Sequence, residues 1–397
     1  MPRRNGGRGG GWNAGAVYRC RRGQSLAISG KTTRYYYISI KNCYLCNMNT
    51  QMNSCDEQFM RRALQLAARG SQTASPNPMV GAVVVCNGKI IGEGWHRRCG
   101  EGHAEVNAVA SVRDKSLLPH STIYVTLEPC SHFGKTPPCC DLIIANHIPR
   151  VVVGCVDPFA QVHGRGISRL REAGIDVSVG VLEEECKAIN KKFFTANTLN
   201  RPFVLLKWAQ SRDRFIARES APVAFSTPET SMLVHAIRAR YDAILIGANT
   251  AITDNPSLTV RSWSGKSPVR VLIDLNNRVP DSARIFTDGG NTIVFTSRKR
   301  VLPDNVKIID TPGHDDFLPE MLARLKDEGI NSLIVEGGAF TLQRFIDARL
   351  WDEVRIETSP VTLGEGVMAP SLTNSALINV EFLSKNLIER FERVKNL

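Results

Sequence analysis

Four residues of the sequence have the types and spacing of a catalytic zinc site. His103 and Glu105 stand two positions apart, and Cys130 and Cys139 follow with a spacing of nine. One imidazole and two thiolates give zinc three protein ligands and leave a fourth position open for water, which is typical of catalytic rather than structural zinc. Bound zinc lowers the pKa of that water toward neutrality. Glu105 would then carry protons, first as general base and later as general acid.

Two other interpretations of these residues stay open. The signature of zinc nucleobase deaminases is H-x-E followed by P-C-x-x-C, and this chain has the first half but a longer cysteine loop. The residues could instead be a buried histidine with unrelated core cysteines, or a closed structural zinc site. A closed site usually takes a fourth cysteine or histidine, for which Cys140 is the candidate. Because adjacent residues rarely bind one ion without strain, we expect Cys140 to pack in the core.

A second candidate functional region is the glycine pair Gly337-Gly338. It follows an apolar run and Glu336. Glycines at the start of a helix let a phosphate approach backbone N–H groups at its positive end. A glycine pair by itself is more often only a turn, so this signal is weaker than the zinc pattern.

Length and composition indicate an ordinary globular protein. At about 150 residues per domain, 397 residues predict two domains. The apolar and charged fractions, 43% and 22%, are close to globular averages. No apolar stretch reaches the roughly 18 residues that span a bilayer. The eleven cysteines are an odd number, which favours a reducing compartment such as the cytoplasm.

The net charge of +12 is concentrated in an N-terminal tail. Residues 1–51 contain nine Lys or Arg and no Asp or Glu, whereas residues 52–397 have 41 basic and 38 acidic residues. The near-neutral body therefore lacks the electrostatic footprint of a polyanion-binding protein. We expect the tail to be disordered and dispensable. A zinc knuckle at Cys43 and Cys46, a transit peptide, an RNA-binding tail and a true start at Met52 stay open as alternatives.

Hydrophobic periodicity predicts an α/β protein with two domains. Strands are expected at 80–85, 90–91, 122–127, 151–156 and 175–179, and helices at 54–69, 103–112, 139–147, 164–173 and 182–194. A polar segment at 197–202 marks the boundary between domains 52–197 and 201–397. Further strands are expected at 203–208, 242–247, 268–273, 292–296, 331–335 and 352–358, with helices at 228–240, 317–329 and 338–347. This alternation predicts βαβ units and largely parallel sheets covered on both faces.

Three segments make a family resemblance specific: Ser-Pro-Asn-Pro-Met-Val-Gly at 75–81, His-Ala-Glu-Val-Asn-Ala at 103–108, and Thr-Leu-Glu-Pro-Cys-Ser-His-Phe-Gly-Lys-Thr-Pro-Pro-Cys at 126–139. From about residue 54 to its end the chain resembles the bifunctional deaminase–reductases of riboflavin biosynthesis. The resemblance implies a cytidine-deaminase-like βαβ domain followed by a dihydrofolate-reductase-like domain. It also implies zinc-dependent hydrolytic deamination of 2,5-diamino-6-(5-phosphoribosylamino)pyrimidin-4-one, then NADPH reduction of the ribosyl group to ribityl.

The resemblance assigns roles to residues in both halves. Beside catalytic Glu105 and the metal ligands His103, Cys130 and Cys139, it implies substrate contacts from Asn77, His132, Lys135 and Asp157. In the reductase it implies substrate contacts from Lys207, Ser226, Arg238 and Arg261, with Thr227 as a further candidate. The implied NADPH-binding residues are Gly247, Thr250, Asp254, Glu336, Gly337 and Gly338. Amide, lysine and histidine side chains suit a base edge and a phosphate.

Two positions depart from the family pattern. Phe159 stands where asparagine is common, so a substrate contact from this position is in doubt. Asp213-Arg214 stands where Asp-Gly is usual. An arginine there costs about 1 kcal/mol or more if its φ angle is positive.

Two functions from other classes stay open. One is a nucleic-acid-editing zinc deaminase with an accessory domain, which the near-neutral body and the long cysteine loop disfavour. The other is a zinc-stabilised binding protein without catalysis, which would have no need of Glu105. We expect a small phosphorylated pyrimidine as substrate, no nucleic-acid or membrane partner, and a homo-oligomer.

Overall fold

The computed structural model describes five stretches of the chain, residues 55–132, 137–159, 163–218, 223–311 and 316–394. From the preceding residues it describes only the backbone of two short antiparallel strands, β1 (Tyr18–Arg19) and β2 (Ser25–Leu26). The predictions for the rest of the tail, including the zinc knuckle, lie outside the described residues. None of the described helices is long and apolar enough to cross a membrane.

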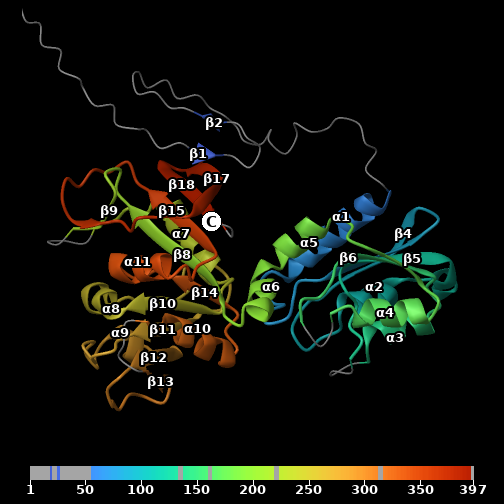
Figure 1. Cartoon of the computed structure of the whole chain (residues 1–397), viewed down its shortest axis with the longest axis horizontal. Helices are drawn as coiled ribbons and strands as arrows, with labels where there is room; N and C mark the ends of the chain where they lie inside the picture. Colours follow the sequence, from blue (N-terminus) through green and yellow to red (C-terminus); the bar gives the residue numbers. More distant parts are fainter. Residues whose placement is uncertain are drawn as a thin grey trace, which may run out of the picture.

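The N-terminal body surrounds a five-stranded sheet in the order β4-β3-β5-β6-β7 (Figure 1). The strands are β3 (Gly81–Cys86), β4 (Lys89–Trp95), β5 (Ser121–Leu127), β6 (Arg150–Cys155) and β7 (Asp176–Val179). Strands β5, β6 and β7 are parallel, but β3 is antiparallel to both of its neighbours. The prediction of a largely parallel sheet is therefore wrong for this part. A two-residue turn at Asn87 and Gly88, both with positive φ, reverses the chain after β3.

Helices cover both faces of this sheet, as predicted. They are α1 (Cys55–Ala67), α2 (Ala104–Ser111), α3 (Cys139–Ala145), α4 (Arg165–Glu172), α5 (Glu183–Ile189) and α6 (Lys191–Thr198), with short 3-10 segments η2 (Ala68–Gly70) and η3 (Lys115–His120). Helices α1 and α5 pack on one face, and α2, α3 and α4 on the other. The single helix predicted at 182–194 is wrong. It is two helices, α5 and α6, that meet at Asn190, whose side chain hydrogen-bonds to the backbone N–H and C=O of Met79.

The C-terminal body has a nine-stranded sheet in the order β13-β12-β11-β10-β14-β8-β15-β18-β17. Its strands are β8 (Phe203–Gln210), β10 (Ala243–Gly247), β11 (Val269–Ile273), β12 (Thr292–Thr296), β13 (Val306–Asp310), β14 (Ser332–Val335), β15 (Glu353–Thr358), β17 (Ser375–Leu383) and β18 (Asn386–Arg393). From β13 to β15 all neighbours are parallel, and β18 and β17 add an antiparallel hairpin. A separate pair joins β9 (Phe215–Ala217) to β16 (Val367–Met368).

Five helices accompany the larger sheet: α7 (Pro228–Arg238), α8 (Ala248–Asp254), α9 (Arg284–Thr287), α10 (Leu318–Asp327) and α11 (Ala339–Asp347). Helices α10 and α11 pack on one face, and α8 and α9 on the other. Sequence analysis missed α8, α9, β13 and the β17–β18 hairpin. The hairpin is an edge whose residues are mostly half-buried or exposed, so its apolar residues do not alternate cleanly.

Helix α6 lies between the two bodies (Figure 1). Lys191 at its start forms an ion pair with Glu353 of β15, and the Lys192 ammonium lies over the ring of Tyr241. A further hydrogen bond of 2.8 Å joins Ser75 Oγ to Asp242. The segment before Asn77 is therefore tied to the C-terminal body, although the boundary itself stays a prediction.

Candidate active sites

The predicted metal ligands converge at the ends of three elements of the N-terminal body. His103 is the residue that precedes α2, Cys130 follows β5, and Cys139 is the first residue of α3. His103 Nδ1 lies 3.6 Å from Cys130 Sγ and 3.4 Å from Cys139 Sγ. The edges of a tetrahedron with zinc–ligand bonds near 2.0–2.3 Å are about 3.6 Å long. The third separation, between the two sulfurs, is at most 4.8 Å, so the three ligand atoms could hold one zinc ion.

The thiol chemistry also suits a cation. The backbone N–H of Cys139 donates to Cys130 Sγ at 3.3 Å, at the positive end of α3. Hydrogen bonding from Cys139 and from His103 lowers the pKa of Cys130 to about 4. Cys140 is fully buried, and its thiol hydrogen-bonds to the carbonyls of Pro129 and Gly166. Cys140 therefore packs in the core, in agreement with the prediction for this residue.

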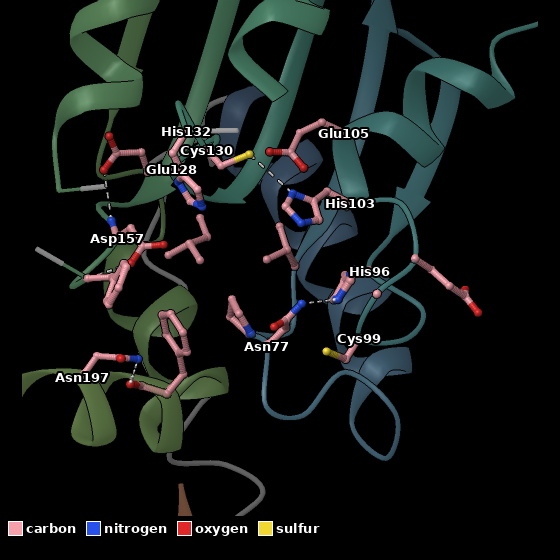
Figure 2. A pocket seen from close by; sticks show the side chains of 17 residues that line it. Asn77, His96, Cys99, His103, Glu105, Glu128, Cys130, His132, Asp157 and Asn197 are labelled. Carbon is pink, nitrogen blue, oxygen red and sulfur yellow. Dashed lines mark hydrogen bonds between the residues drawn. The ribbon is translucent and has the colours of Figure 1, made fainter. Parts of the chain in front are cut away.

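Glu105 is the second residue of α2 and lies beside the metal ligands (Figure 2). Its side chain is 3% exposed, and burial raises the pKa of the carboxyl to about 7. The close packing of α2 on β4 fixes this position. A Cβ atom on Gly94 would lie within 2.4 Å of the backbone of Ala104 and Ala108, so only glycine lets the helix approach the strand this closely.

A cavity of about 430 Å³ opens in front of these groups. Its walls include the metal ligands His103 and Cys130, together with Glu105 and three of the predicted substrate contacts, which are Asn77, His132 and Asp157. These side chains surround one space in Figure 2. Lys135, the fourth predicted contact, lies outside the described residues.

Several residues of the cavity wall were missed by sequence analysis, among them His96, Phe193 and Asn197. His96 is 3% exposed, and its Nε2 lies 3.1 Å from Asn77 Nδ2. Because an amide nitrogen only donates, His96 Nε2 must accept, and its Nδ1–H donates to Gly102 O at 3.3 Å. His96 thereby leaves the Asn77 carbonyl oxygen free to accept. Its only sequence signal is its place seven residues before His103.

The far side of the cavity is organised by a buried carboxylate that sequence analysis passed over. Glu128 accepts four backbone hydrogen bonds of 2.9–3.2 Å, from Asp157, Gly164, Gly166 and Ile167. It thereby joins the end of β6 to the start of α4. Burial raises the pKa of Asp157 to about 6, and its carboxylate accepts from Phe159 N–H at 2.8 Å. The Phe159 ring lines the cavity, where the amide common in the family would be polar.

In the C-terminal body three predicted residues form a compact charged group. Arg238 of α7 makes two hydrogen bonds, of 3.2 and 2.7 Å, to Glu336 at the end of β14. Lys207 lies on the neighbouring strand β8, where Leu206 pairs with Val335. Burial alone would raise the pKa of Glu336, but the charges of Lys207 and Arg238 lower it to about 2. Burial lowers the pKa of Lys207, and Glu336 opposes that effect.

The predicted cofactor residues lie at the ends of the adjacent strands β10 and β14. A Cβ atom on Gly337 would stand 2.8 Å from Gly247 N, so the glycine allows the two chain segments to touch. Gly338 N–H donates to Thr250 Oγ1 at 2.8 Å. This N–H is therefore occupied within the protein. The prediction that the glycine pair exposes its N–H groups to a phosphate is therefore wrong for Gly338.

The remaining predicted residues lie farther from this charged group. Arg261 is exposed and hydrogen-bonds to Thr259 Oγ1, while Thr259 O accepts from Arg238. Asp254 is exposed at the end of α8. Ser226 is half-buried and precedes Thr227, the N-cap residue of α7, whose hydroxyl accepts from Thr230 N–H. The part of the chain that the structure describes has no hydrogen bond from Ser226 or Asp254 to the Arg238–Glu336 pair.

Arg214, which stands where the family usually has glycine, has the positive φ angle that makes an arginine costly at this position. Arg214 has a φ of 68°, in the left-handed region that favours glycine. The turn is nevertheless well hydrogen-bonded. Arg214 N–H donates to Ser211 O, and the carboxylate of Asp213 accepts from the backbone of Leu363 and Gly364.

Comparisons with known proteins agree with this division into two sites. The family described as "Cytidine and deoxycytidylate deaminase zinc-binding region" matches residues 53–155, and "RibD C-terminal domain" matches residues 202–390. The "Riboflavin biosynthesis protein RibD" of Aquifex aeolicus is 39% identical over 350 residues, covering 86% of this chain and 96% of that protein. The Escherichia coli protein of the same name is 40% identical over 328 residues, covering 78% and 89%.

Two solved structures are similar over most of their length. One is the Thermotoga maritima diaminohydroxyphosphoribosylaminopyrimidine deaminase/5-amino-6-(5-phosphoribosylamino)uracil reductase, at 38% identity and a TM-score of 0.79, covering 86% of this chain and 99% of that one. The other is Acinetobacter baumannii RibD, at 31% identity, the same TM-score and the same coverage.

Proposed function

The chain belongs to the RibD family of riboflavin-biosynthesis proteins, and from that premise we propose which of its residues carry out the family's two reactions. It is a bifunctional enzyme that uses Zn²⁺ and NADPH. It deaminates a small phosphorylated diaminopyrimidine by hydrolysis and then reduces the ribosyl group of the product to ribityl. The alternative of a nucleic-acid-editing deaminase is not favoured.

His103, Cys130 and Cys139 hold the zinc ion, since their ligand atoms already lie at the spacing that the metal needs. Zinc bound there supplies Lewis-acid activation of a water molecule. Cys140 takes no part, because its thiol is engaged by two backbone carbonyls.

Glu105 moves the proton. Its carboxylate accepts the proton that the attacking water loses and delivers it to the departing 2-amino group, which leaves as ammonia. A proton carrier works best when its pKa is near the working pH, and burial raises the pKa of Glu105 to about 7. The packing of α2 on β4 keeps the carboxylate in place throughout.

The cavity walls orient the pyrimidine and its sugar phosphate. Asn77, whose amide nitrogen is held by His96, accepts from an N–H group of the ring through its carbonyl oxygen. His132 and Asp157 contact the substrate from the opposite wall, and Lys135 supplies a positive charge for the phosphate. Glu128 supports Asp157 by holding its backbone.

In the reductase half Lys207 and Arg238 bind and orient the substrate, and Ser226 and Arg261 extend the pocket toward its phosphate. Glu336, a predicted NADPH-binding residue, holds Arg238 in place through two hydrogen bonds. The adjoining wall, for NADPH, is formed by Gly247, Gly337, Thr250 and Asp254. When bound there, NADPH supplies the hydride. Thr250 also satisfies Gly338 N–H, so it acts on the shape of this wall as well as on the cofactor.

The observation that carries the proposal is the meeting of His103, Cys130 and Cys139 beside the buried carboxylate of Glu105. The test supplies the zinc-loaded full chain with the diaminopyrimidine substrate and NADPH, and follows ammonia and NADPH together. Ammonia should appear without NADPH, and NADPH should be consumed only after deamination. Oxidation of NADPH before ammonia appears would contradict the proposed order.

We also propose domains at 52–197 and 201–397, a homo-oligomeric state and a cytoplasmic location. All eight described cysteines are free thiols, which suits a reducing compartment. Sedimentation equilibrium tests the oligomeric state. Expression of the two segments separately tests the boundary, with each segment expected to keep its own activity.

A further inference from the structure

Buried polar atoms without partners gather at one place in the C-terminal body. Within the described stretches, the buried side-chain nitrogens and oxygens that make no hydrogen bond are Arg355 Nη1 and Nη2, Glu357 Oε2 and Asn386 Oδ1. The side chains of Arg355, Glu357 and Asn386 are 3%, 0% and 0% exposed. Native proteins rarely leave such atoms unsatisfied, so four of them in one cluster indicate a missing polar group.

The cluster has a defined geometry. Asn386 Nδ2 donates to Glu357 Oε1 at 2.6 Å and to Phe225 O at 2.8 Å, which fixes the carboxylate and leaves its second oxygen open. Arg355 Nη1 lies 3.7 Å from Glu357 Oε2. This distance is short enough for an ion pair but too long for a hydrogen bond. A buried donor and a buried acceptor therefore lie side by side, and neither has a hydrogen-bond partner.

The cluster adjoins the substrate residues of the reductase half. Arg355 pairs with Lys207 across the parallel strands β15 and β8, so their side chains leave the same face of the sheet. On the other side of Lys207, strand β14 ends at Val335, and Glu336 follows directly after it. The charges of Glu336, Arg238, Arg355 and Glu357 all act on Lys207. Arg355 thus extends the charged row Glu336–Lys207 by one strand.

The chemistry of the pair selects its ligand. The charges of Arg355 and Glu357 oppose each other, and a phosphate would meet the carboxylate at close range in a buried place. A hydroxyl group can accept from Arg355 and donate to Glu357 in the same position. We propose that Arg355 and Glu357, held by Asn386, form a binding site for a hydroxyl group of the substrate's ribosyl chain. This inference rests on the proposed reductase function.

The test measures binding of D-ribose 5-phosphate and of inorganic phosphate to the zinc-loaded full chain by calorimetry. Arg355→Met should weaken binding of D-ribose 5-phosphate by about tenfold or more, the effect of losing one charge-assisted hydrogen bond, and leave binding of inorganic phosphate unchanged. Glu357→Gln keeps the size of the side chain and should have a smaller effect in the same direction. The matched control is Arg390→Met, because Arg390 pairs with Arg355 from β18 and is half-exposed.

The outcomes separate this inference from the proposed function. If Arg355→Met weakens the binding of both probes equally, Arg355 acts only as a positive charge that attracts any anion. If it changes the binding of neither probe, the cluster is a site for ordered water. Unfolding of both variants would make it a structural ion pair, and each of these results overturns the proposal. If the wild type reduces the deaminated intermediate while Arg355→Met keeps its KM, only the inference fails. If the wild type does not oxidise NADPH with that intermediate, the proposed reductase function fails.

Discussion

The two sites of this protein are assembled in different ways. The three candidate zinc ligands and Glu105 come from two segments close in sequence, 103–105 and 130–139, at the ends of elements of one body. The reductase groups come from α7, β8 and the end of β14, and Glu336 lies 98 residues from its partner Arg238. The first site is therefore encoded by local motifs, whereas the second depends on strand order.

The two buried carboxylates show what this difference means for chemistry. Glu105 has no arginine or lysine partner among the described residues, and burial raises its pKa to about 7. The side chain of Glu336 is 10% exposed, and the charges of Lys207 and Arg238 lower the pKa of its carboxyl to about 2. A residue that must exchange a proton needs a pKa near neutrality. A residue that orients a substrate for hydride transfer from a cofactor needs a fixed charge.

The largest expected effect is the loss of proton transfer in the deamination reaction. Glu105→Ala should lower ammonia release by at least about a hundredfold, because the proton carrier is lost while all three zinc ligands remain. Metal analysis should still find one zinc per chain. Reduction of the deaminated intermediate should be unchanged, which is the internal control. Undiminished ammonia release would remove Glu105 from the mechanism.

The next largest expected effect is the loss of stability when the negative charge of Glu336 is removed. Glu336→Gln should lower the free energy of unfolding of the C-terminal body by about 3–5 kcal/mol, because Arg238 and Lys207 lose their buried counter-charge. Denaturant unfolding followed in a separately expressed C-terminal segment measures it. Arg270 also forms an ion pair, with the exposed carboxylate of Asp288, so Asp288→Asn is a control that should spare substrate binding. A loss of stability below about 1 kcal/mol would contradict the assignment.

The dependence of stability on pH also distinguishes Glu336 from Glu105. The folded-state pKa of Glu336, about 2, lies below its ordinary value of 4.5. The stability that this carboxylate contributes is therefore fully present above about pH 4.5 and is lost as the pH falls toward 2. Glu336→Gln should reduce the slope of stability against pH in that range. An unchanged slope would show that other carboxylates produce it.

A smaller effect concerns the support of the deaminase cavity. Glu128→Gln places an amide N–H₂ group against backbone N–H groups that now bind a carboxylate, which should cost about 1–3 kcal/mol. The KM for the diaminopyrimidine should rise because Asp157 loses its anchor, while zinc content stays constant. Asp114→Asn, at an exposed carboxylate, is the control. A change in zinc content without a change in KM would place the role of Glu128 at the metal instead.

The smallest effect concerns the departure at Arg214. Arg214→Gly should stabilise the C-terminal body by up to about 1 kcal/mol, since glycine adopts a positive φ without steric cost but loses more chain entropy. Thermal unfolding measures the change. Arg218→Gly is the control, because Arg218 is not among the residues with positive φ. Destabilisation by Arg214→Gly would show that the side chain makes contacts worth more than the strain.

The candidate zinc ligands and Glu105 could be predicted from the sequence alone, because they lie in short motifs whose residue types admit few other uses. It also determined the α/β class and most of the helices, since apolar periodicity is a local property. It did not predict the break at Asn190, which follows from hydrogen bonds to Met79, more than a hundred residues away.

Which polar residues contact one another depends on the tertiary structure and could not be predicted from the sequence. His96 and Glu128 look unremarkable in the chain, yet one orients Asn77 and the other holds four backbone N–H groups. Arg355 reaches Lys207 only because β15 pairs with β8 in a particular register. Local patterns fix where strands form, whereas strand order and register arise from packing of the whole sheet, and these decide the reductase pocket.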